Sequence, residues 1–203
     1  MTVIRICLLF GGTTLIGWIV LAVLNRRRHP TPMSPLWIWT LKIPMRIFEL
    51  RRVLAPLSGQ GDMKLLEVGC GPGVVLDIAA AKLDQSSHLY GIDLQYSMLT
   101  RARDRMHRYG HCNSYLAQAN ATSLPFTEGS FDHVYMISVL GEIPEKATAV
   151  SEAMRVLKPK GMLSIIEHFM DPDHLSSSQV VGVCLSAGVR CERSDGSRWS
   201  RIL

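Results

Sequence analysis

The feature that most constrains this chain is residues 65–75, which read LLEVGCGPGVV. Three glycines and a proline fall within five positions, between an apolar run that predicts a strand and a second apolar run that predicts a helix. Glycines at such a junction let the backbone approach a ligand closely, and the first turn of the helix offers free N–H groups. The loop therefore predicts a ligand site between a strand and the helix that follows it.

Short apolar segments alternate with helical ones from residue 64 onward, which predicts an α/β fold. The sheet is expected to be mostly parallel, with helices on both faces. The helix at residues 97–109 is predicted to begin at Ser97 as its N-cap, and Pro159 and Gly161 are predicted to end the helix at residues 146–157. The predicted strands are 64–68, 88–93, 114–118, 132–137 and 162–168, with short RCERS and RWSRIL strands after them, and the other helices are 74–83 and 176–187.

The loop has the pattern G-x-G-x-G, formed by Gly69, Gly71 and Gly73. Val74 stands where the dinucleotide fingerprint G-x-G-x-x-G requires its third glycine, and no Gly-Lys-Ser/Thr follows as it would in a phosphate-binding loop. Pro72 also removes one N–H that a pyrophosphate would use. The pattern thus favours a nucleoside ligand without phosphates.

Asp93 ends the second predicted strand, twenty positions after Gly73, where a carboxylate can accept both hydroxyls of a ribose. Four segments, the first of which contains the loop, resemble the class I S-adenosylmethionine-dependent methyltransferases over roughly residues 60–195. They are LLEVGCGPG, GIDLQYSML, NATSLPFTEGSFDHVYM and EAMRVLKPKGMLSIIEHF. RVLKPKGMLSIIEH is also similar to the quinone-methylating branch. The Asn-Pro-Pro-Tyr signature of enzymes that methylate nucleic acids or glutamine is absent from the sequence.

The resemblance implies the Rossmann-like class I methyltransferase sheet and the cofactor S-adenosyl-L-methionine. By the same resemblance, Glu67 and the three loop glycines would contact the methionine part of the cofactor, Asp93 would hold the ribose hydroxyls, and Leu94 would pack on the adenine. Asn120 and Ala121 would meet the adenine edge. Many relatives have aspartate where Asn120 stands, and an amide oxygen can still accept from the adenine amino group.

Methyl transfer requires an aligned nucleophile, exclusion of water and, for many oxygen or carbon acceptors, a base. Ligands of parallel sheets lie beyond the carboxyl ends of the strands. Glu142, after the fourth predicted strand, and Glu167 and His168, at the end of the fifth, are therefore the candidate catalytic residues. The alternative is that Glu142 caps a helix and His168 is an ordinary loop residue.

The five cysteines have scattered spacings and form no C-x-x-C pair, so the sequence predicts no metal site and no disulfide framework. A reducing compartment is expected. At 203 residues, the chain fits one domain of ordinary size plus an appendage.

Residues 6–24 carry no charge and, as a helix, are just long enough to span a bilayer. Three arginines follow at 26–28, and only Arg5 precedes, so the positive-inside rule predicts a single-pass anchor with the N-terminus outside and the catalytic domain in the cytoplasm. A signal peptide and a buried core helix are the alternatives. The predicted parts are an anchor at 1–25, a juxtamembrane linker or helix at 26–60 and the methyltransferase domain at 61–203.

The juxtamembrane segment is basic and contains Trp37 and Trp39, which suit the headgroup layer. Its apolar residues recur at near-helical spacing with arginines between them, which predicts either an interfacial helix or a first helix packed on the domain. Beside an uncharged span, this basic patch favours anionic lipid over nucleic acid, and no nucleic-acid partner is expected.

The sequence therefore predicts a membrane-anchored methyltransferase whose acceptor is a hydrophobic small molecule or lipid, quinone-like in kind. A methyltransferase for hydrophobic thiols is one alternative, because thiol methyltransferases share an N-terminal anchor ahead of this domain. A catalytically inactive, cofactor-binding membrane scaffold is another. The resemblance also implies a seventh, antiparallel strand beside the fifth, which RWSRIL would form as a short strand.

Overall fold

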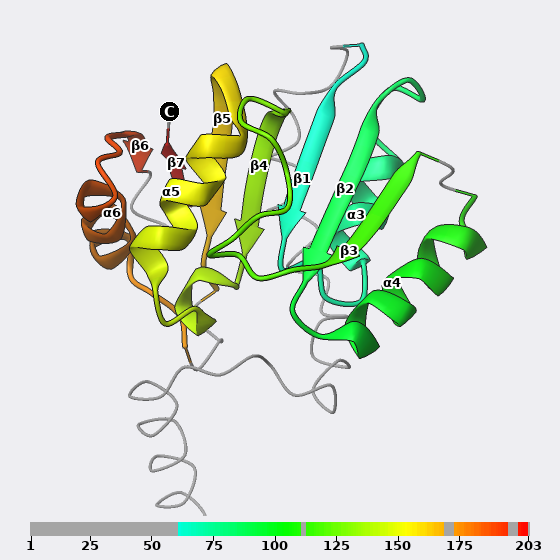
Figure 1. Cartoon of the computed structure of the whole chain (residues 1–203), viewed down its shortest axis with the longest axis horizontal. Helices are drawn as coiled ribbons and strands as arrows, with labels where there is room; N and C mark the ends of the chain where they lie inside the picture. The colour runs from blue at the N-terminus through cyan, green and yellow to red at the C-terminus, as the bar shows by residue number, and fades with distance from the viewer. Residues whose placement is uncertain (1–60, 111–112, 169–172, 195–198, 203) are drawn as a thin grey trace, which may run out of the picture.

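The computed structural model describes residues 61–110, 113–168, 173–194 and 199–202 (Figure 1). The predicted anchor and juxtamembrane segment lie outside these residues. In the described ranges, no helix combines the length and the apolar character that crossing a membrane requires. The elements are β1 (Lys64–Val68), α3 (Val74–Ala80), β2 (His88–Asp93), α4 (Tyr96–Arg108), β3 (Ser114–Gln118), β4 (Phe131–Ile137), η3 (Leu140–Glu142), α5 (Lys146–Val156), β5 (Leu157–Ile166), α6 (Ser177–Ser186), β6 (Cys191–Ser194) and β7 (Trp199–Ile202).

Seven strands form one sheet in the order β3-β2-β1-β4-β5-β7-β6. The first five are parallel to one another, whereas β7 pairs antiparallel with both β5 and β6. The strand order reverses at β1, which lies between β2 and β4, so the chain turns away in opposite directions after these strands. The sheet confirms the predicted mostly parallel α/β fold, and β7 is the short antiparallel strand expected beside β5.

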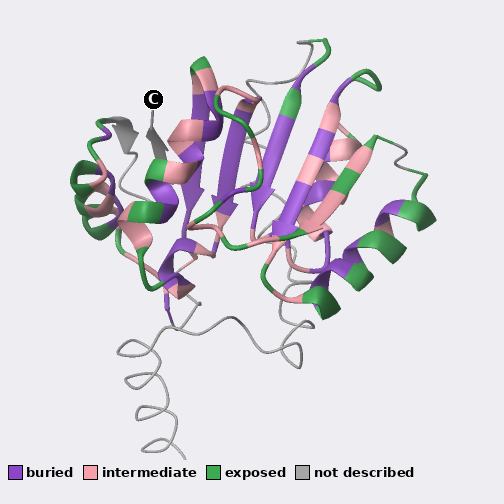
Figure 2. Cartoon of the chain, in the orientation of Figure 1, coloured by how far each residue is buried: buried purple, intermediate pink, exposed green. Residues whose placement is uncertain are grey.

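The sheet is buried on both faces, which explains why its central strands read as continuous apolar runs. Adjacent residues of β1 point to opposite sides: Leu65 packs in a cluster that includes Leu76 of α3 and Leu99 of α4. Leu66 packs in a second cluster, with Val150 of α5 and others from α6. Figure 1 shows α5 in front of the sheet and α3 behind it, and Figure 2 shows the central strands buried along most of their length.

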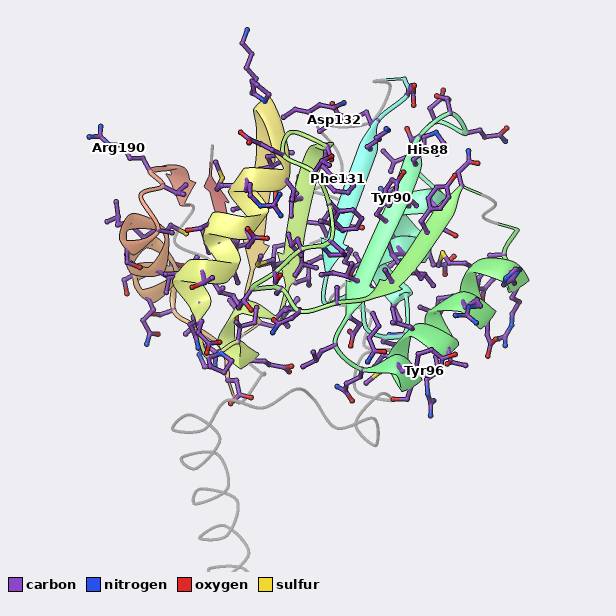
Figure 3. The ribbon with its side chains drawn as sticks, viewed as in Figure 1. His88, Tyr90, Tyr96, Phe131, Asp132 and Arg190 are labelled. Carbon is purple, nitrogen blue, oxygen red and sulfur yellow. The ribbon has the colours of Figure 1, made fainter. Side chains whose placement is uncertain are left out.

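Aromatic side chains fill the face that α5 also covers, toward β2 and β3. Tyr90 stacks on Tyr115 with ring centroids 4.9 Å apart, and it meets Phe131 edge-on at 5.1 Å. In Figure 3, Tyr90 and Phe131 lie over the upper part of the sheet, toward the starts of its strands, whereas Tyr96 marks the start of α4 at the lower edge, where the parallel strands end. The carboxyl edge of the sheet is thus left for loops rather than for the aromatic core.

Two local predictions are wrong. Helix α4 begins at Tyr96 with Gln95 as its N-cap, not at Ser97, because the Asp93 carboxylate accepts the N–H of Gln95 at 2.8 Å and so fixes the turn two residues earlier. Strand β5 begins at Leu157, directly after α5, and contains the proline and glycine that were predicted to end the helix. The pairing of β4 with β5 shifts register there, so the breaker residues form an irregularity inside the strand.

Candidate functional site

The glycine loop occupies 69–73, between the end of β1 and the start of α3, and all three of its glycines have positive φ. A Cβ at Gly69 would overlap both γ carbons of Val139, which follows β4. A Cβ at Gly73 would lie 3.0 Å from the backbone and side chain of Ala102 in α4. Two of the glycines are therefore required by close packing, and Gly71, with nothing within 4 Å of its Cβ position, faces open space.

Asp93 joins this loop to the end of β2. One carboxylate oxygen accepts the N–H of Gly71 at 2.9 Å, and the other accepts the N–H of Gln95 at 2.8 Å. Burial raises the pKa of Asp93, and the two backbone hydrogen bonds lower it by less. Each oxygen retains a second lone pair, so the carboxylate can accept two ligand hydroxyls while it holds the loop.

Glu67 lies in β1, at the base of the loop, and is 2% exposed. The hydroxyl of Tyr135 in the adjacent β4 is directed at its carboxylate, 3.5 Å away. Burial, and then the negative charge of Glu67, raise the pKa of the Tyr135 hydroxyl well above its ordinary value. The pKa of Cys70 is also raised well above its ordinary value by burial, then by the charges of Glu67 and Asp93, and this disfavours the thiolate that a nucleophilic cysteine requires.

The segment after β3 carries the other two predicted adenine contacts, Asn120 and Ala121. The Asn120 side-chain oxygen accepts the N–H of Thr122 at 3.0 Å, which holds the turn that follows. Arg155 of α5 fixes the rest of the segment by donating to the carbonyl oxygens of Leu124 and Phe126 at 3.0 and 2.8 Å. Asn120 thus uses one lone pair of its side-chain oxygen within its own turn.

These segments line one cavity of about 360 Å³, which is within the ordinary size range of small-molecule sites. It lies at the carboxyl ends of β1, β2 and β4, where the strand order reverses. Every predicted cofactor residue lines it except Gly73, which is the N-cap of α3. The lining residues that were predicted are Glu67, Gly69, Gly71, Asp93, Leu94, Asn120 and Ala121.

The lining of the cavity is apolar apart from four carboxylates and a few neutral polar groups. The acidic residues are Glu67, Asp93, Glu142 and Glu145, and among the described residues no lysine, arginine or histidine lines the cavity. This charge favours a cationic ligand and disfavours a pyrophosphate. S-adenosyl-L-methionine carries a sulfonium and an amino group, so its charge fits the cavity. In the described part of the chain, no group of three acidic, histidine or cysteine residues could hold a metal ion.

The structure separates the predicted catalytic candidates. Glu142, in η3, lines the cavity. Glu167 is buried and instead accepts the backbone N–H groups of Gly141 and Leu175 at 3.4 and 3.3 Å. His168 is not among the lining residues, and its Nδ1 lies 2.6 Å from the hydroxyl oxygen of Ser138, which does line the cavity.

Ser138 is the functional candidate that sequence reasoning missed. It directly follows β4, is 6% exposed, and has a φ of 53°. Left-handed backbone is uncommon for a residue other than glycine, asparagine or aspartate and is concentrated at functional sites. No periodicity or motif in the sequence distinguishes this serine from the other serines of the chain.

Residues 66–165 match the family described as Methyltransferase domain. The chain is 32% identical to the phosphatidylethanolamine N-methyltransferase of Cereibacter sphaeroides over 120 residues, which are 59% of this chain and 57% of that protein. It is also 32% identical to the demethylmenaquinone methyltransferase of Anoxybacillus flavithermus over 111 residues, 55% of this chain and 47% of that protein. The chain thus spans about half the length of the curated relatives it matches.

Among solved structures, the chain resembles a SAM-dependent methyltransferase from Aquifex aeolicus with a TM-score of 0.73. The comparison covers 84% of this chain and 97% of that one, at 24% identity. A likeness at this identity shows that the two share a fold.

Proposed function

We propose that this chain transfers a methyl group from S-adenosylmethionine to a hydrophobic small molecule or lipid. The match of residues 66–165 to the Methyltransferase domain family and the fold shared with the Aquifex aeolicus structure support this proposal. The observation that carries the proposal is the cavity, in which a glycine loop and the carboxylates of Glu67 and Asp93 meet an otherwise apolar wall. The bound cofactor would supply an activated methyl group. Glu67 and the loop would hold its methionine part, and Asp93 its ribose hydroxyls.

The acceptor side of the cavity supports a hydrophobic substrate. The segment from the end of β4 to the start of α5 contributes Ile137, Val139, Ile143 and Pro144 to the wall, with Glu142 and Glu145 among them. Two of the curated relatives carry the names of a phospholipid and a quinone acceptor, both of them hydrophobic. An apolar wall of this kind lowers the free energy of a bound apolar substrate and excludes water from the transfer.

Attachment to a membrane would raise the local concentration of such an acceptor. Residues 6–24 are uncharged, and the arginines at 26–28 follow at once, which supports a single-pass anchor with the N-terminus outside and the domain in the cytoplasm. We expect the full-length chain to remain in the membrane fraction after a carbonate wash. Release of the full-length chain by that wash would contradict the anchor and leave the cavity and its proposed chemistry unaffected.

The cofactor site is tested first, by isothermal titration of the purified full-length chain with S-adenosylmethionine. We expect Asp93→Asn to weaken binding by about tenfold or more, which corresponds to ~1.4 kcal/mol. The matched control is Asp104→Asn, which removes an exposed carboxylate of α4 that does not line the cavity. The proposal is overturned if the folded wild-type chain does not bind the cofactor, or if both variants weaken binding equally.

The acceptor is tested by following S-adenosylhomocysteine formation with three probes: a prenylated hydroquinone, phosphatidylethanolamine vesicles and a long-chain alkyl thiol. Turnover of the hydroquinone or the phospholipid supports the proposal. Turnover of the thiol alone would favour the hydrophobic-thiol alternative. Binding of the cofactor without turnover of any probe would favour the inactive scaffold.

A further inference from the structure

We propose that Ser138 and His168 form a proton relay at the acceptor side of the cavity. In this relay, the Ser138 hydroxyl oxygen takes the proton that the acceptor loses, and Ser138 passes its own proton to Nδ1 of His168. The inference deepens the proposed function and rests on it. Ser138 would be the catalytic residue, because it lines the cavity, and His168 a positioning residue that acts through it.

The first observation is the conformation of Ser138. Its φ of 53° places it in the left-handed region, which strains a residue with a Cβ unless the surrounding structure compensates. The backbone N–H of Ser138 donates to the carbonyl oxygen of Ile166 at 2.7 Å, which fixes the residue against the end of β5. Glycine would adopt this backbone without strain. Serine is strained here, and what it provides that glycine lacks is a hydroxyl group.

The second observation is the contact between Ser138 and His168. The 2.6 Å separation between the serine oxygen and Nδ1 is at the short end of the hydrogen-bond range. The two residues come from the carboxyl ends of β4 and β5, which are paired in parallel up to Ile137 and Ile166. Ser138 lines the cavity and its hydroxyl contacts the imidazole, so Ser138 connects the cavity wall to a group that can hold a proton.

The third observation is that the sheet contains a second pair of the same kind. Nε2 of His133 in β4 lies 2.9 Å from the hydroxyl oxygen of Ser164 in β5, and both residues are buried. Neither residue lines the cavity. This second pair joins the same two strands without reaching the site, and it therefore serves as a control for a purely structural role.

The step balances in atoms and charge. The bond between hydrogen and the acceptor atom breaks as the bond from that atom to the methyl carbon forms, and the carbon–sulfur bond breaks with its electron pair remaining on sulfur. The acceptor's proton moves to the Ser138 oxygen while the serine's own proton moves to His168. One positive charge thereby leaves the sulfonium and one appears on the imidazole, with no other reactant.

The relay requires that Nδ1 of His168 be free of hydrogen before transfer, so that Ser138 donates to it. Two-dimensional ¹H–¹⁵N spectra of the full-length chain, labelled at histidine, report this tautomer directly. His168→Asn identifies the His168 signals by their loss. We expect the proton on Nε2. A proton on Nδ1 of the neutral ring would mean that His168 donates to Ser138, and the relay would be overturned whether or not an acceptor is known.

Two variants test the chemistry. Ser138→Gly removes only the hydroxyl and suits the left-handed backbone, and His168→Asn keeps an acceptor oxygen near the position of Nδ1 but no basic nitrogen. Ser164→Ala is the matched control. The probes are a prenylated hydroquinone, whose hydroxyl holds its proton at neutral pH, and 4-nitrothiophenol, which ionises without a base.

We expect both relay variants to lose about 100-fold or more in turnover of the hydroquinone, as for the loss of a general base, and to lose little with the thiophenol. Their affinity for S-adenosylmethionine should match that of the wild type, and Ser164→Ala should turn over both probes normally. An equal loss with both probes, or no loss with the hydroquinone, would overturn the relay. Absence of turnover by the wild type would count against the proposed function instead, and the histidine spectra would still decide the relay.

Discussion

The loop at residues 69–73 makes a sharp prediction, because Gly69 and Gly71 share a left-handed backbone but have different surroundings. Their φ angles are 72° and 52°. The Cβ of Gly69→Ala would overlap the γ carbons of Val139, one of them at 2.7 Å, whereas the Cβ of Gly71→Ala would meet nothing within 4 Å. The two substitutions make the same chemical change, and so their difference isolates the packing against Val139.

The magnitudes follow from these surroundings. A left-handed residue with a Cβ costs roughly 1–2 kcal/mol, and we expect this loss of unfolding free energy from Gly71→Ala. Overpacking adds roughly 1–3 kcal/mol, so Gly69→Ala should lose roughly 2–5 kcal/mol in all. Val139→Ala removes the two γ carbons that the new methyl group would overlap and leaves the Cβ of residue 139, at 3.1 Å, as the remaining close contact. In the double variant, the coupling should therefore restore about 1–3 kcal/mol relative to the sum of the single changes.

The assay is urea unfolding of the full-length chain and its variants, followed by circular dichroism, with cofactor titration in parallel. Gly71→Ala adds its methyl group to the cavity wall, so it should weaken cofactor binding while it remains the more stable of the two single variants. Equal losses of unfolding free energy for the two glycine variants would refute this account of the loop. Additive losses in the double variant would refute the role of Val139.

Three further predictions concern ionisable groups in the same cavity. Burial raises the pKa of Asp93, so the unfolded chain releases this proton more readily than the folded one. The free energy of unfolding therefore falls as pH rises from the ordinary carboxyl pKa through the raised pKa of the folded state. Asp93→Asn removes this dependence. In urea unfolding from about pH 3 to pH 7, the free energy of unfolding of the variant should therefore rise relative to that of the wild type as pH rises; a relative fall would contradict the burial argument. Glu67→Gln should narrow the preference for S-adenosylmethionine over S-adenosylhomocysteine in competition titrations, because only the former has a cationic sulfur; an unchanged preference would place Glu67 away from that sulfur. Since burial raises the pKa of Cys70, iodoacetamide at pH 8 should modify Cys70 only after unfolding. Mass spectrometry of peptides that shows rapid modification of Cys70 in the folded chain would disprove its burial.

Much of the fold could be predicted because its signals are local. The strands β1, β2 and β3 were predicted to the residue, since each apolar run is bounded by polar or glycine residues within a few positions. The start of β5 could not be predicted in the same way. Pro159 and Gly161 normally end an element, but the shift in register against β4 accommodates them within the strand, and Lys158 pairs there with Asp132 at 2.8 Å. That pairing depends on a contact between distant parts of the chain.

The cofactor side of the site was accessible from sequence for a similar reason. The glycine loop is contiguous, and Asp93 follows at a fixed distance set by one helix and one strand. The acceptor side has no such motif. His168 was a candidate by its place at the end of a strand, but its route to the cavity runs through Ser138, thirty residues earlier. Only the register between β4 and β5 brings these two side chains together.

The negative charge of the cavity also limits which interactions can lower the barrier to methyl transfer. Four carboxylates, with no cationic side chain among the described lining residues, stabilise a positive ligand most strongly before transfer, when its charge is complete. An interaction that weakens as the methyl group leaves contributes to binding and to release of the neutral product, but it cannot lower the barrier between bound substrate and transition state. Acceleration must therefore come from alignment, from exclusion of water and from removal of the acceptor's proton. Of the residues at the end of β4, Ser138 is placed for that last role, since it lines the cavity and its hydroxyl hydrogen-bonds His168.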